Sequence, residues 1–143
     1  MPREITPYLM FDGKCRDAMT FYQQVLGGEL QLTTYGQTDP KAAAAEKDKV
    51  IHARLESGST VIMASDSGHG IPVKDGDDVW LSLQCGPASE VDALYGKLAA
   101  GGASPQPPHD AFWGTRFGML VDRFGVQWML SSDPLPGAPR GPG

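Results

Sequence analysis

The sequence predicts an α+β fold built from two copies of a βαβββ unit. Two stretches with helical spacing of apolar residues share a local pattern, DAM…VLGGEL at residues 17–30 and DAL…LAAGGA at residues 92–103, about 75 residues apart. Each follows a short apolar stretch and precedes a further strand and a hairpin, ARLESGSTVIMAS in the first half and MLVDRFGVQWMLS in the second. Self-similarity at this scale indicates a tandem repeat.

Short apolar stretches bounded by turn residues predict the strands. They are ITPYLMF, GELQLTTY, KVIHARLE, STVIMAS, DVWLSLQC, RFGMLVD and GVQWMLS. Gly58 and Gly125 lie where two hairpins must turn, and glycine adopts turn conformations that other residues resist. We therefore assign both glycines to the scaffold.

Two apolar stripes at helical spacing predict the helices. The first contains Ala18, Met19, Tyr22, Val25 and Leu26 and ends at Gly27-Gly28. The second contains Val91, Leu94, Tyr95 and Leu98 and ends at Gly101-Gly102. Glycine pairs are typical of helix C-termini, and the hydroxyl of Ser89 is expected to cap the start of the second helix.

The length of 143 residues suits one domain made of both units. We expect the first unit at residues 1–66, a linker at 67–78, the second unit at 79–133 and a disordered tail at 134–143.

Bulk composition excludes several classes of protein. A net charge of −5 without a Lys/Arg run argues against binding to nucleic acid. The apolar stretches are too short to cross a membrane, and the N-terminus does not have the pattern of a secretory signal. Two cysteines, Cys15 and Cys85, are expected to be reduced and buried in a cytoplasmic protein.

Three segments together resemble one known group of proteins: PYLMFDGKCRDAMTFYQQVLGGEL, IHARLESGSTVIMASD and WGTRFGMLVDRFGVQWML. They resemble the PhnB-like branch of the vicinal oxygen chelate superfamily, over roughly residues 5–133. The superfamily includes glyoxalase I, the extradiol dioxygenases and the fosfomycin- and bleomycin-resistance proteins. The resemblance implies an open, U-shaped mixed β-sheet (glyoxalase/bleomycin resistance-like) around a cavity, and a homodimer.

In catalytic members of the superfamily, His or Glu side chains at four places bind a divalent metal ion. Carried onto this sequence, these places fall on Pro7, on His52, on Val79 or Trp80, and on Met129. A catalytic ion needs about three protein ligands, and only His52 qualifies. His69 and His109 are expected in loops, and we do not expect them to complete a site.

Strand alternation predicts which side chains face the cavity. We expect Ile51, Ala53 and Leu55, Val79, Leu81, Leu83 and Cys85, and Val126, Trp128 and Leu130 to pack in the core. The cavity is expected to receive Leu9, Phe11, His52, Arg54, Glu56, Trp80, Ser82, Gln84, Gln127 and Met129.

The candidate ligand-binding residues are therefore Phe11, His52, Arg54, Trp80, Ser82, Gln84, Trp113 and Met129. His52 is either a general base or ligand-orienting group, or a wall residue bonded to a neighbour. Arg54 either binds an anion or pairs with Glu56. Trp113 lines an apolar pocket or packs at a core or dimer surface, and for Phe117 the second role is preferred.

Other chemistries have no signal in the sequence. Neither cysteine has a neighbouring histidine in sequence, so no activated nucleophile is predicted. Relatives of this branch have been labelled ubiquinone methyltransferases, but no glycine-rich strand-to-helix turn is present to hold S-adenosylmethionine.

The predicted function is metal-independent binding of a small organic molecule, with no cofactor. The alternative is a lyase, isomerase or dioxygenase that uses one divalent metal ion bound by His52 and by loop histidines or carboxylates. A third hypothesis is that Trp80 and Met129 fill the cavity and that the protein acts through its dimer surface.

Overall fold

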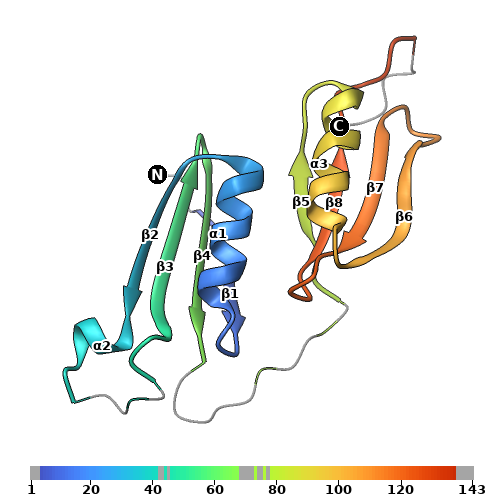
Figure 1. The fold of residues 1–143 in the computed structure, drawn as a ribbon. Helices are drawn as coiled ribbons and strands as arrows, with labels where there is room; N and C mark the ends of the chain where they lie inside the picture. The colour runs from blue at the N-terminus through green and yellow to red at the C-terminus, as the bar shows by residue number, and fades with distance from the viewer. Residues whose placement is uncertain are drawn as a thin grey trace. The chain divides into compact units, whose positions relative to one another are not determined.

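The computed structural model describes residues 4–41, 44, 46–67, 73, 76 and 78–137. The chain forms two compact units, Met1–Lys74 and Asp75–Gly143. The division between them falls within the stretch predicted as a linker. In each unit a helix of 12 residues lies across one face of a four-stranded sheet (Figure 1). The predicted α+β fold of two βαβββ units is confirmed.

The first unit contains β1 (Tyr8–Phe11), α1 (Cys15–Leu26), β2 (Glu29–Thr34), the short helix α2 (Tyr35–Thr38), β3 (Val50–Ser57) and β4 (Thr60–Asp66). Its sheet has the order β1-β4-β3-β2. Strand β1 runs parallel to β4, and the other pairs are antiparallel.

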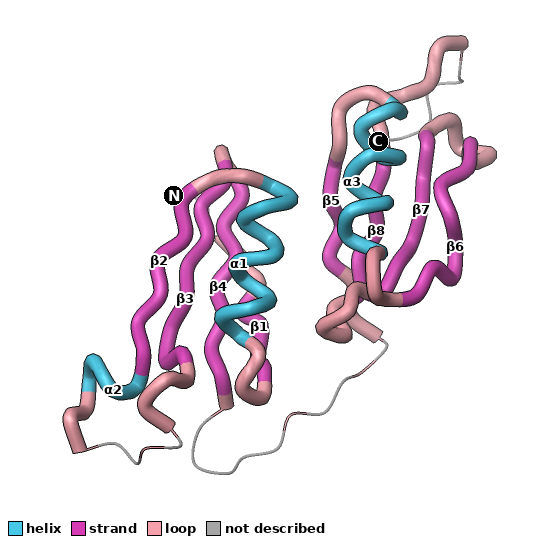
Figure 2. The backbone as a smooth tube through the Cα atoms, viewed as in Figure 1, coloured by secondary structure: helices cyan, strands magenta, loops and turns pink. Residues whose placement is uncertain are grey.

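The second unit contains β5 (Leu81–Gln84), α3 (Ala88–Ala99), β6 (Ala103–Asp110), β7 (Arg116–Val121) and β8 (Gln127–Ser131). Its strand order, β5-β8-β7-β6, has the same pattern of pairing, with β5 parallel to β8 (Figure 2). Within the described residues, no helix is long and apolar enough to span a bilayer.

Each core lies between the helix and one face of the sheet. In the first unit, Ala18, Met19 and Tyr22 of α1 are fully buried, as are Ala53 and Leu55 of β3. In the second unit the fully or almost fully buried set is Val91, Leu98, Leu120, Trp128 and Leu130. Burying a large apolar side chain contributes about 1.5–3 kcal/mol, so these rows hold each helix on its sheet.

The predicted scaffold glycines have the backbone conformations that their turns require. Gly58 and Gly125 lie in the two hairpins at φ +60° and +87°. Gly27 ends α1 at φ +78°, and its N–H donates to the carbonyl of Gln23 over 2.7 Å. Gly28 passes so close to the Glu56 backbone that a Cβ would lie 2.0 Å from its carbonyl oxygen.

Three local predictions were wrong. Ser89 does not cap α3, because the helix begins one residue earlier, at Ala88 after Pro87, and has no side-chain cap. Val79 precedes β5 and is 71% exposed instead of packing in the core. The pairing of β2 with β3 shifts register at Ile51, because Thr33 pairs with His52 and Thr34 pairs with Val50. Ile51 is therefore left unpaired, and Val50 is the fully buried residue instead.

Two further segments differ from the sequence reading. The sequence ASPQPPHD forms β6, which the apolar pattern did not show and which places His109 in a strand instead of a loop. His69 lies outside the described residues, as do residues 138–143 of the expected tail. Residues 134–137 are described, and the Leu135 N–H donates to the Gly114 carbonyl over 2.8 Å.

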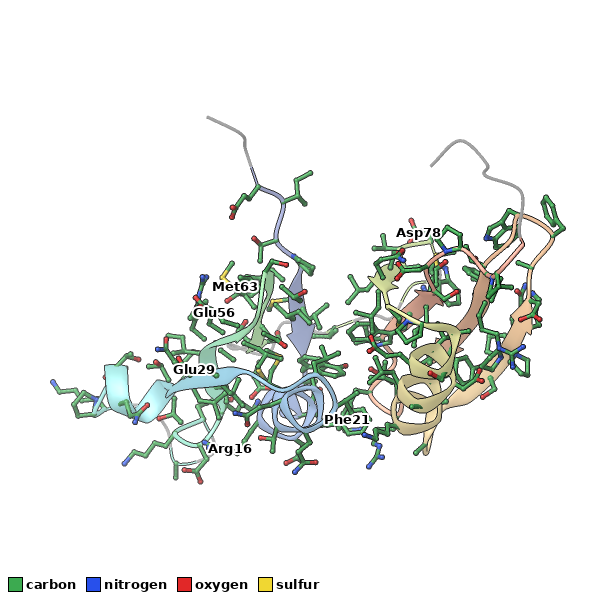
Figure 3. The ribbon with its side chains drawn as sticks, turned by 90° about the horizontal axis from the view of Figure 1, so that it is seen from above. Arg16, Phe21, Glu29, Glu56, Met63 and Asp78 are labelled. Atoms are coloured by element: carbon green, nitrogen blue, oxygen red, sulfur yellow. The ribbon has the colours of Figure 1, made fainter. Side chains whose placement is uncertain are left out.

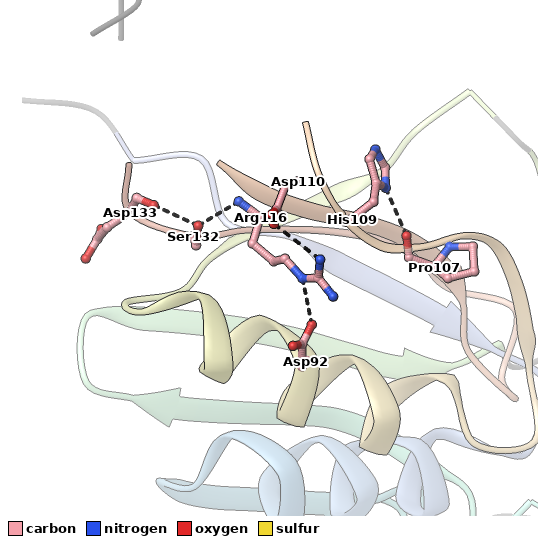
Figure 4. Close-up of polar contacts among 7 residues, drawn as sticks. All are labelled: Asp92, Pro107, His109, Asp110, Arg116, Ser132 and Asp133. Carbon is pink, nitrogen blue, oxygen red and sulfur yellow. Dashed lines mark hydrogen bonds and ion pairs between the residues drawn. The ribbon is translucent and has the colours of Figure 1, made fainter. Parts of the chain in front are cut away.

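The carboxylate of Asp66, at the end of β4, is 2% exposed and links three elements of the first unit. Oδ1 accepts the Cys15 N–H at the start of α1, and Oδ2 accepts the Val50 N–H at the start of β3, both over 2.9 Å. The Tyr35 hydroxyl donates to the Asp66 carbonyl. At the matching place of the second unit, the hydroxyl of Ser132 accepts the Arg116 N–H over 2.8 Å (Figure 4).

Arg116 also ties α3 to β6. Its guanidinium donates to Asp92 over 3.0 Å and to Asp110 over 3.2 Å (Figure 4). The hydrogen bond with Asp92 is the main cause that raises the pKa of Arg116, and Asp110 adds to the effect. Exposed ion pairs of this kind stabilise a fold only weakly. The Arg116 network therefore orients the β6–β7 hairpin on α3 more than it raises the stability of the unit.

We expect Asp66→Ala to lower the free energy of unfolding by about 3 kcal/mol, because it leaves two buried N–H donors without an acceptor. Urea unfolding followed by circular dichroism measures the change. The matched control is Asp12→Ala, which removes an exposed carboxylate and should stay within about 0.5 kcal/mol of the parent. Equal effects of the two substitutions would contradict the anchoring role of Asp66.

Candidate functional site

Each sheet has one face against its helix and one face away from it, which we call the open face. In the first sheet, the buried residues Ala53, Leu55, Ile62 and Ala64 face α1. Alternation puts the neighbouring side chains on the open face: Tyr8, Met10, Gln31, Thr33, His52, Arg54, Glu56, Met63 and Ser65. Figure 3 shows Met63 and Glu56 on the side of the sheet away from α1.

His52 and Tyr8 meet on the open face of the first unit. The Tyr8 hydroxyl lies 3.3 Å from Nδ1 of His52, and the ring centroids are 5.9 Å apart. Tyr8 comes from β1 and His52 from β3, with β4 between them in the sheet. His52 thus has a hydrogen-bonding partner, and the sequence analysis did not name Tyr8 as that partner.

Arg54 forms the predicted ion pair with Glu56, two residues along the same strand. Its Nε and Nη2 donate to Oε1 of Glu56 over 2.9 and 2.7 Å, and Nη1 lies 4.0 Å from the Met63 sulfur. The two side chains are 39% and 54% exposed. The guanidinium is therefore held in place, but with much of its charge already paired.

Two hollows adjoin this ion pair. The larger encloses about 500 Å³ and is lined by Glu4, Ile5, Thr6, Arg54, Glu56, Ser59 and Val61. The smaller encloses about 50 Å³ and is lined by Glu29, Gln31, Arg54 and Glu56. Neither lining contains His52, so the hollows lie toward the Arg54–Glu56 end of the open face.

The open face of the second unit combines polar and apolar side chains. Ser82, Met129 and Met119 lie opposite one another across β5, β8 and β7, and Gln84, Ser131 and Phe117 form the adjoining row. The Gln84 amide donates to the Cys85 carbonyl over 3.1 Å. Trp80 is half-buried immediately before β5.

Trp113 belongs to an aromatic cluster at the turn between β6 and β7. Its ring packs edge-to-face against Phe112 and Phe117, with centroids 4.9 and 5.1 Å apart. Its Nε1–H donates to the Thr115 hydroxyl over 2.8 Å. Because Phe117 stands on the open face, the cluster extends from the turn onto that face.

The structure corrects the orientation of β1. Leu9 and Phe11 lie opposite Ala64 and Asp66, on the side that faces α1, and Phe11 is only 5% exposed. Tyr8 and Met10 occupy the open face, at 45% and 48% exposure. Phe11 is therefore a core residue, and the open-face position on this strand is Tyr8 instead of Pro7. Both faces of YLMF are apolar, so hydrophobic alternation alone gave the wrong face.

The candidate residues fall into one set in each unit. His52 and Arg54 share the open face of the first unit with Tyr8. Ser82, Gln84 and Met129 share the open face of the second, with Trp113 joined to it through Phe117. Of the corresponding places, Met63 and Met129 are alike, whereas Tyr8 matches Ser82 and Arg54 matches Met119.

The donor groups do not fit a catalytic divalent metal ion. Among the residues that the structure describes, no three His, Cys, Asp or Glu side chains converge. The places that the resemblance assigns to metal ligands fall on Pro7, on His52, on Val79 or Trp80, and on Met129, and of these only His52 is a ligand of the His or Glu type. Three protein ligands are the usual minimum for a catalytic ion.

The fold is the glyoxalase/bleomycin resistance-like fold. Structures named as glyoxalase/bleomycin resistance protein/dioxygenase proteins match this chain at low identity. One from Nocardioides is 19% identical with a TM-score of 0.59, over 100% of this chain and 92% of its own. One from Burkholderia phytofirmans is 17% identical with a TM-score of 0.57, over 87% and 95%.

Closer comparisons identify the family. Protein PA1353 from Pseudomonas aeruginosa is 40% identical with a TM-score of 0.84, over 92% of this chain and 98% of its own. The putative 3-demethylubiquinone-9 3-methyltransferase, PhnB protein, from Bacillus cereus is 29% identical with a TM-score of 0.72, over 92% and 100%. Escherichia coli protein YjdN is 30% identical, over 89% and 93%.

The chain belongs to the family described as 3-demethylubiquinone-9 3-methyltransferase, which matches residues 3–131. This is the PhnB-like branch of the vicinal oxygen chelate superfamily that the sequence predicts.

Both thiols are poor nucleophiles in the folded protein. Burial raises the pKa of Cys15 to about 12, with Asp66 adding to the shift, and burial raises the pKa of Cys85 to about 11. The thiolate is the reactive form of cysteine. Neither group therefore contributes a nucleophile to the open faces.

We expect a thiol-specific disulfide reagent at pH 8 to leave the folded protein unmodified and to label both cysteines in urea. The raised folded pKa values also predict that thiol ionisation leaves stability unchanged below pH 9 and lowers it as the pH rises from 9 toward 12. Measuring the same pH dependence in Cys15→Ser and in Cys85→Ser shows how much of the loss of stability above pH 9 each thiol causes. Rapid labelling of the native protein would disprove the burial argument.

Proposed function

We propose that the protein binds a small organic molecule on its open faces without a resident metal ion. The observation that carries the proposal is the set of side chains on these faces. They offer His52 bonded to a phenol, His109 beside Phe117, Arg54 paired with Glu56, thioethers and aromatic rings. In a fold whose catalytic members use His and Glu, no three such groups converge among the described residues.

Methionine is concentrated on the open faces. Met10, Met63, Met119 and Met129 all lie there, while Met19 packs in the core under α1. Methionine is flexible and polarisable, and it makes favourable contacts with aromatic rings. In the second unit, Met119 and Met129 share the open face with Phe117 of the aromatic cluster, and this combination favours a ligand with a flat, apolar body.

The hollow beside Arg54 supports the same proposal. Its volume of about 500 Å³ is within the range of small-molecule sites, roughly 300–1,000 Å³. Such sites combine apolar walls with a few placed polar groups. In this hollow Ile5 and Val61 are the apolar walls, and the other five lining residues are polar or charged. Arg54 and Glu56, at one end of the open face, are two groups of this kind.

Methyl transfer is not part of the proposal, although the family name mentions it. The two glycine pairs end helices α1 and α3 instead of opening them. The turn before each helix has one glycine, Gly13 or Gly86. A cofactor-binding turn of the glycine-rich type opens a helix so that its N-terminus faces the ligand.

A cytoplasmic homodimer remains a prediction from the resemblance.

We expect protein purified without a tag or chelators to contain far less than one equivalent of divalent metal, because the donor set holds too few ligands. Elemental mass spectrometry after incubation with zinc, manganese or iron(II), followed by gel filtration, gives the stoichiometry. His52→Ala is measured in parallel and should give the same result. Near-stoichiometric metal that disappears in His52→Ala would favour the metal-dependent enzyme instead.

A thermal-shift screen of aromatic small molecules should identify a ligand, since a molecule that binds only the folded state raises the melting temperature. We expect Met63→Ala, for a ligand on the first open face, or Met129→Ala, for a ligand on the second, to weaken its binding by about 10-fold, corresponding to the loss of roughly 1.4 kcal/mol of contact. Gln24→Ala on the exposed side of α1 is the matched control. Loss of affinity in the control alone would place the ligand elsewhere.

A further inference from the structure

The bond between Tyr8 and His52 has a direction, and that direction determines what the histidine can recognise. A neutral imidazole has one nitrogen that donates and one that accepts. A phenol is a stronger acid than a neutral imidazole N–H, and an imidazole nitrogen is a stronger base than a phenol oxygen. The better bond over the 3.3 Å contact therefore runs from the Tyr8 O–H to Nδ1 of His52.

We propose that Tyr8 is a positioning residue that holds neutral His52 in the Nε2–H form, so that the open face presents an N–H donor to its ligand. This inference rests on the proposed function and narrows it. The ligand presents a hydrogen-bond-accepting oxygen, of a carbonyl or carboxylate group, to Nε2 of His52.

The Nε2 atom is available for this role. Within the described part of the chain, every buried side-chain nitrogen or oxygen has a hydrogen-bond partner. His52 is half-buried, and its hydrogen bond there is made through Nδ1. Nε2 is therefore reached by solvent. Thr33 lies opposite His52 on β2, and Met63 lies on the neighbouring strand β4.

The same tautomer opposes metal binding. A histidine that binds a metal ion through Nε2 carries its proton on Nδ1 and donates it to an acceptor. Here the partner of Nδ1 is a hydroxyl that is itself a good donor. The tautomer that suits a ligand oxygen is thus the opposite of the one that suits a metal ion at Nε2.

His109 is an internal reference with the opposite form. Its Nδ1 lies 2.9 Å from the carbonyl oxygen of Pro107, and a carbonyl oxygen only accepts (Figure 4). Nδ1 of His109 must therefore carry a proton. One spectrum of the full chain should therefore show His52 and His109 in opposite tautomers, beside the signals of the third histidine, His69.

The test is two-dimensional long-range ¹H–¹⁵N NMR of the full chain, at a pH where the histidines are neutral. Protonated and unprotonated ring nitrogens resonate in well-separated regions. We expect the proton on Nε2 for His52 and on Nδ1 for His109. In Tyr8→Phe, the two nitrogen shifts of His52 should move toward each other as the Nδ1–H form becomes populated, while His109 stays unchanged.

The control is Tyr35→Phe, which removes a different phenol from the same unit and should leave His52 in its parental form. A His52 proton on Nδ1 in the parent, or no change in Tyr8→Phe, would overturn the proposal. Because Tyr8 is 45% exposed, its loss should leave the fold intact, and the unchanged His109 signals confirm this for the second unit.

The recognition step is tested with acetate, acetamide and methylammonium at matched ionic strength. A saturable shift of the His52 Nε2 signal with acetate or acetamide, absent with methylammonium, supports an oxygen acceptor, and the difference between the first two separates a charged from a neutral oxygen. A response to methylammonium alone contradicts the donor assignment. The tautomer readout needs no ligand, so it remains decisive even if the small-molecule screen fails.

Discussion

The first unit depends on the buried carboxylate of Asp66, which is only 2% exposed. Asp66 accepts the first N–H groups of α1 and of β3 from the end of β4, so one side chain fixes where the helix and the strand begin. Because this anchor holds α1 against one face of the sheet, the opposite face is not covered by that helix. In the second unit the hydroxyl of Ser132 replaces part of this function, and Arg116 adds the link between α3 and β6.

The two units use one framework to present different surfaces. The row Tyr8, Met63, Arg54 in the first sheet corresponds to Ser82, Met129, Met119 in the second. Both rows therefore have a hydroxyl on the first strand and a thioether on the middle strand. On the third strand the guanidinium of the first unit is replaced by a thioether in the second. The cores differ as well, since Ile62 and Ala64 of β4 correspond to Trp128 and Leu130 of β8. These core positions stay apolar and hold the helices, whereas the open faces exchange a charged for an apolar side chain at Arg54 and Met119.

The sequence predicted the elements whose signals are local. Helices α1 and α3 follow from apolar spacing and terminal glycines, and the hairpins follow from Gly58 and Gly125. Strand β6 could not be recognised, since three of its eight residues are prolines and its side chains are mostly exposed. A strand of this kind is held by pairing with β7, which is a tertiary interaction.

The candidate site was predictable only where strand faces differ in polarity. His52 and Arg54 alternate with buried Ala53 and Leu55, so their direction could be inferred. Phe11 and Tyr8 lie on a strand with two apolar faces, and the register with β4 decides which side faces the helix. The Ile51 irregularity and the Tyr8–His52 contact depend likewise on pairing between distant strands.

The prolines of β6 bear on how the protein behaves at high concentration. This strand lies at an edge of its sheet, and Pro105, Pro107 and Pro108 have no N–H to offer an approaching chain. A foreign strand laid along this edge would find no donor at any proline whose backbone nitrogen faces outward, away from β7. Exposed edges of this sort are the usual starting points for fibril growth, and proline is one of the residues that natural proteins place there to stop it. The segment that gave the weakest strand signal is thereby suited to keeping the second unit from polymerising.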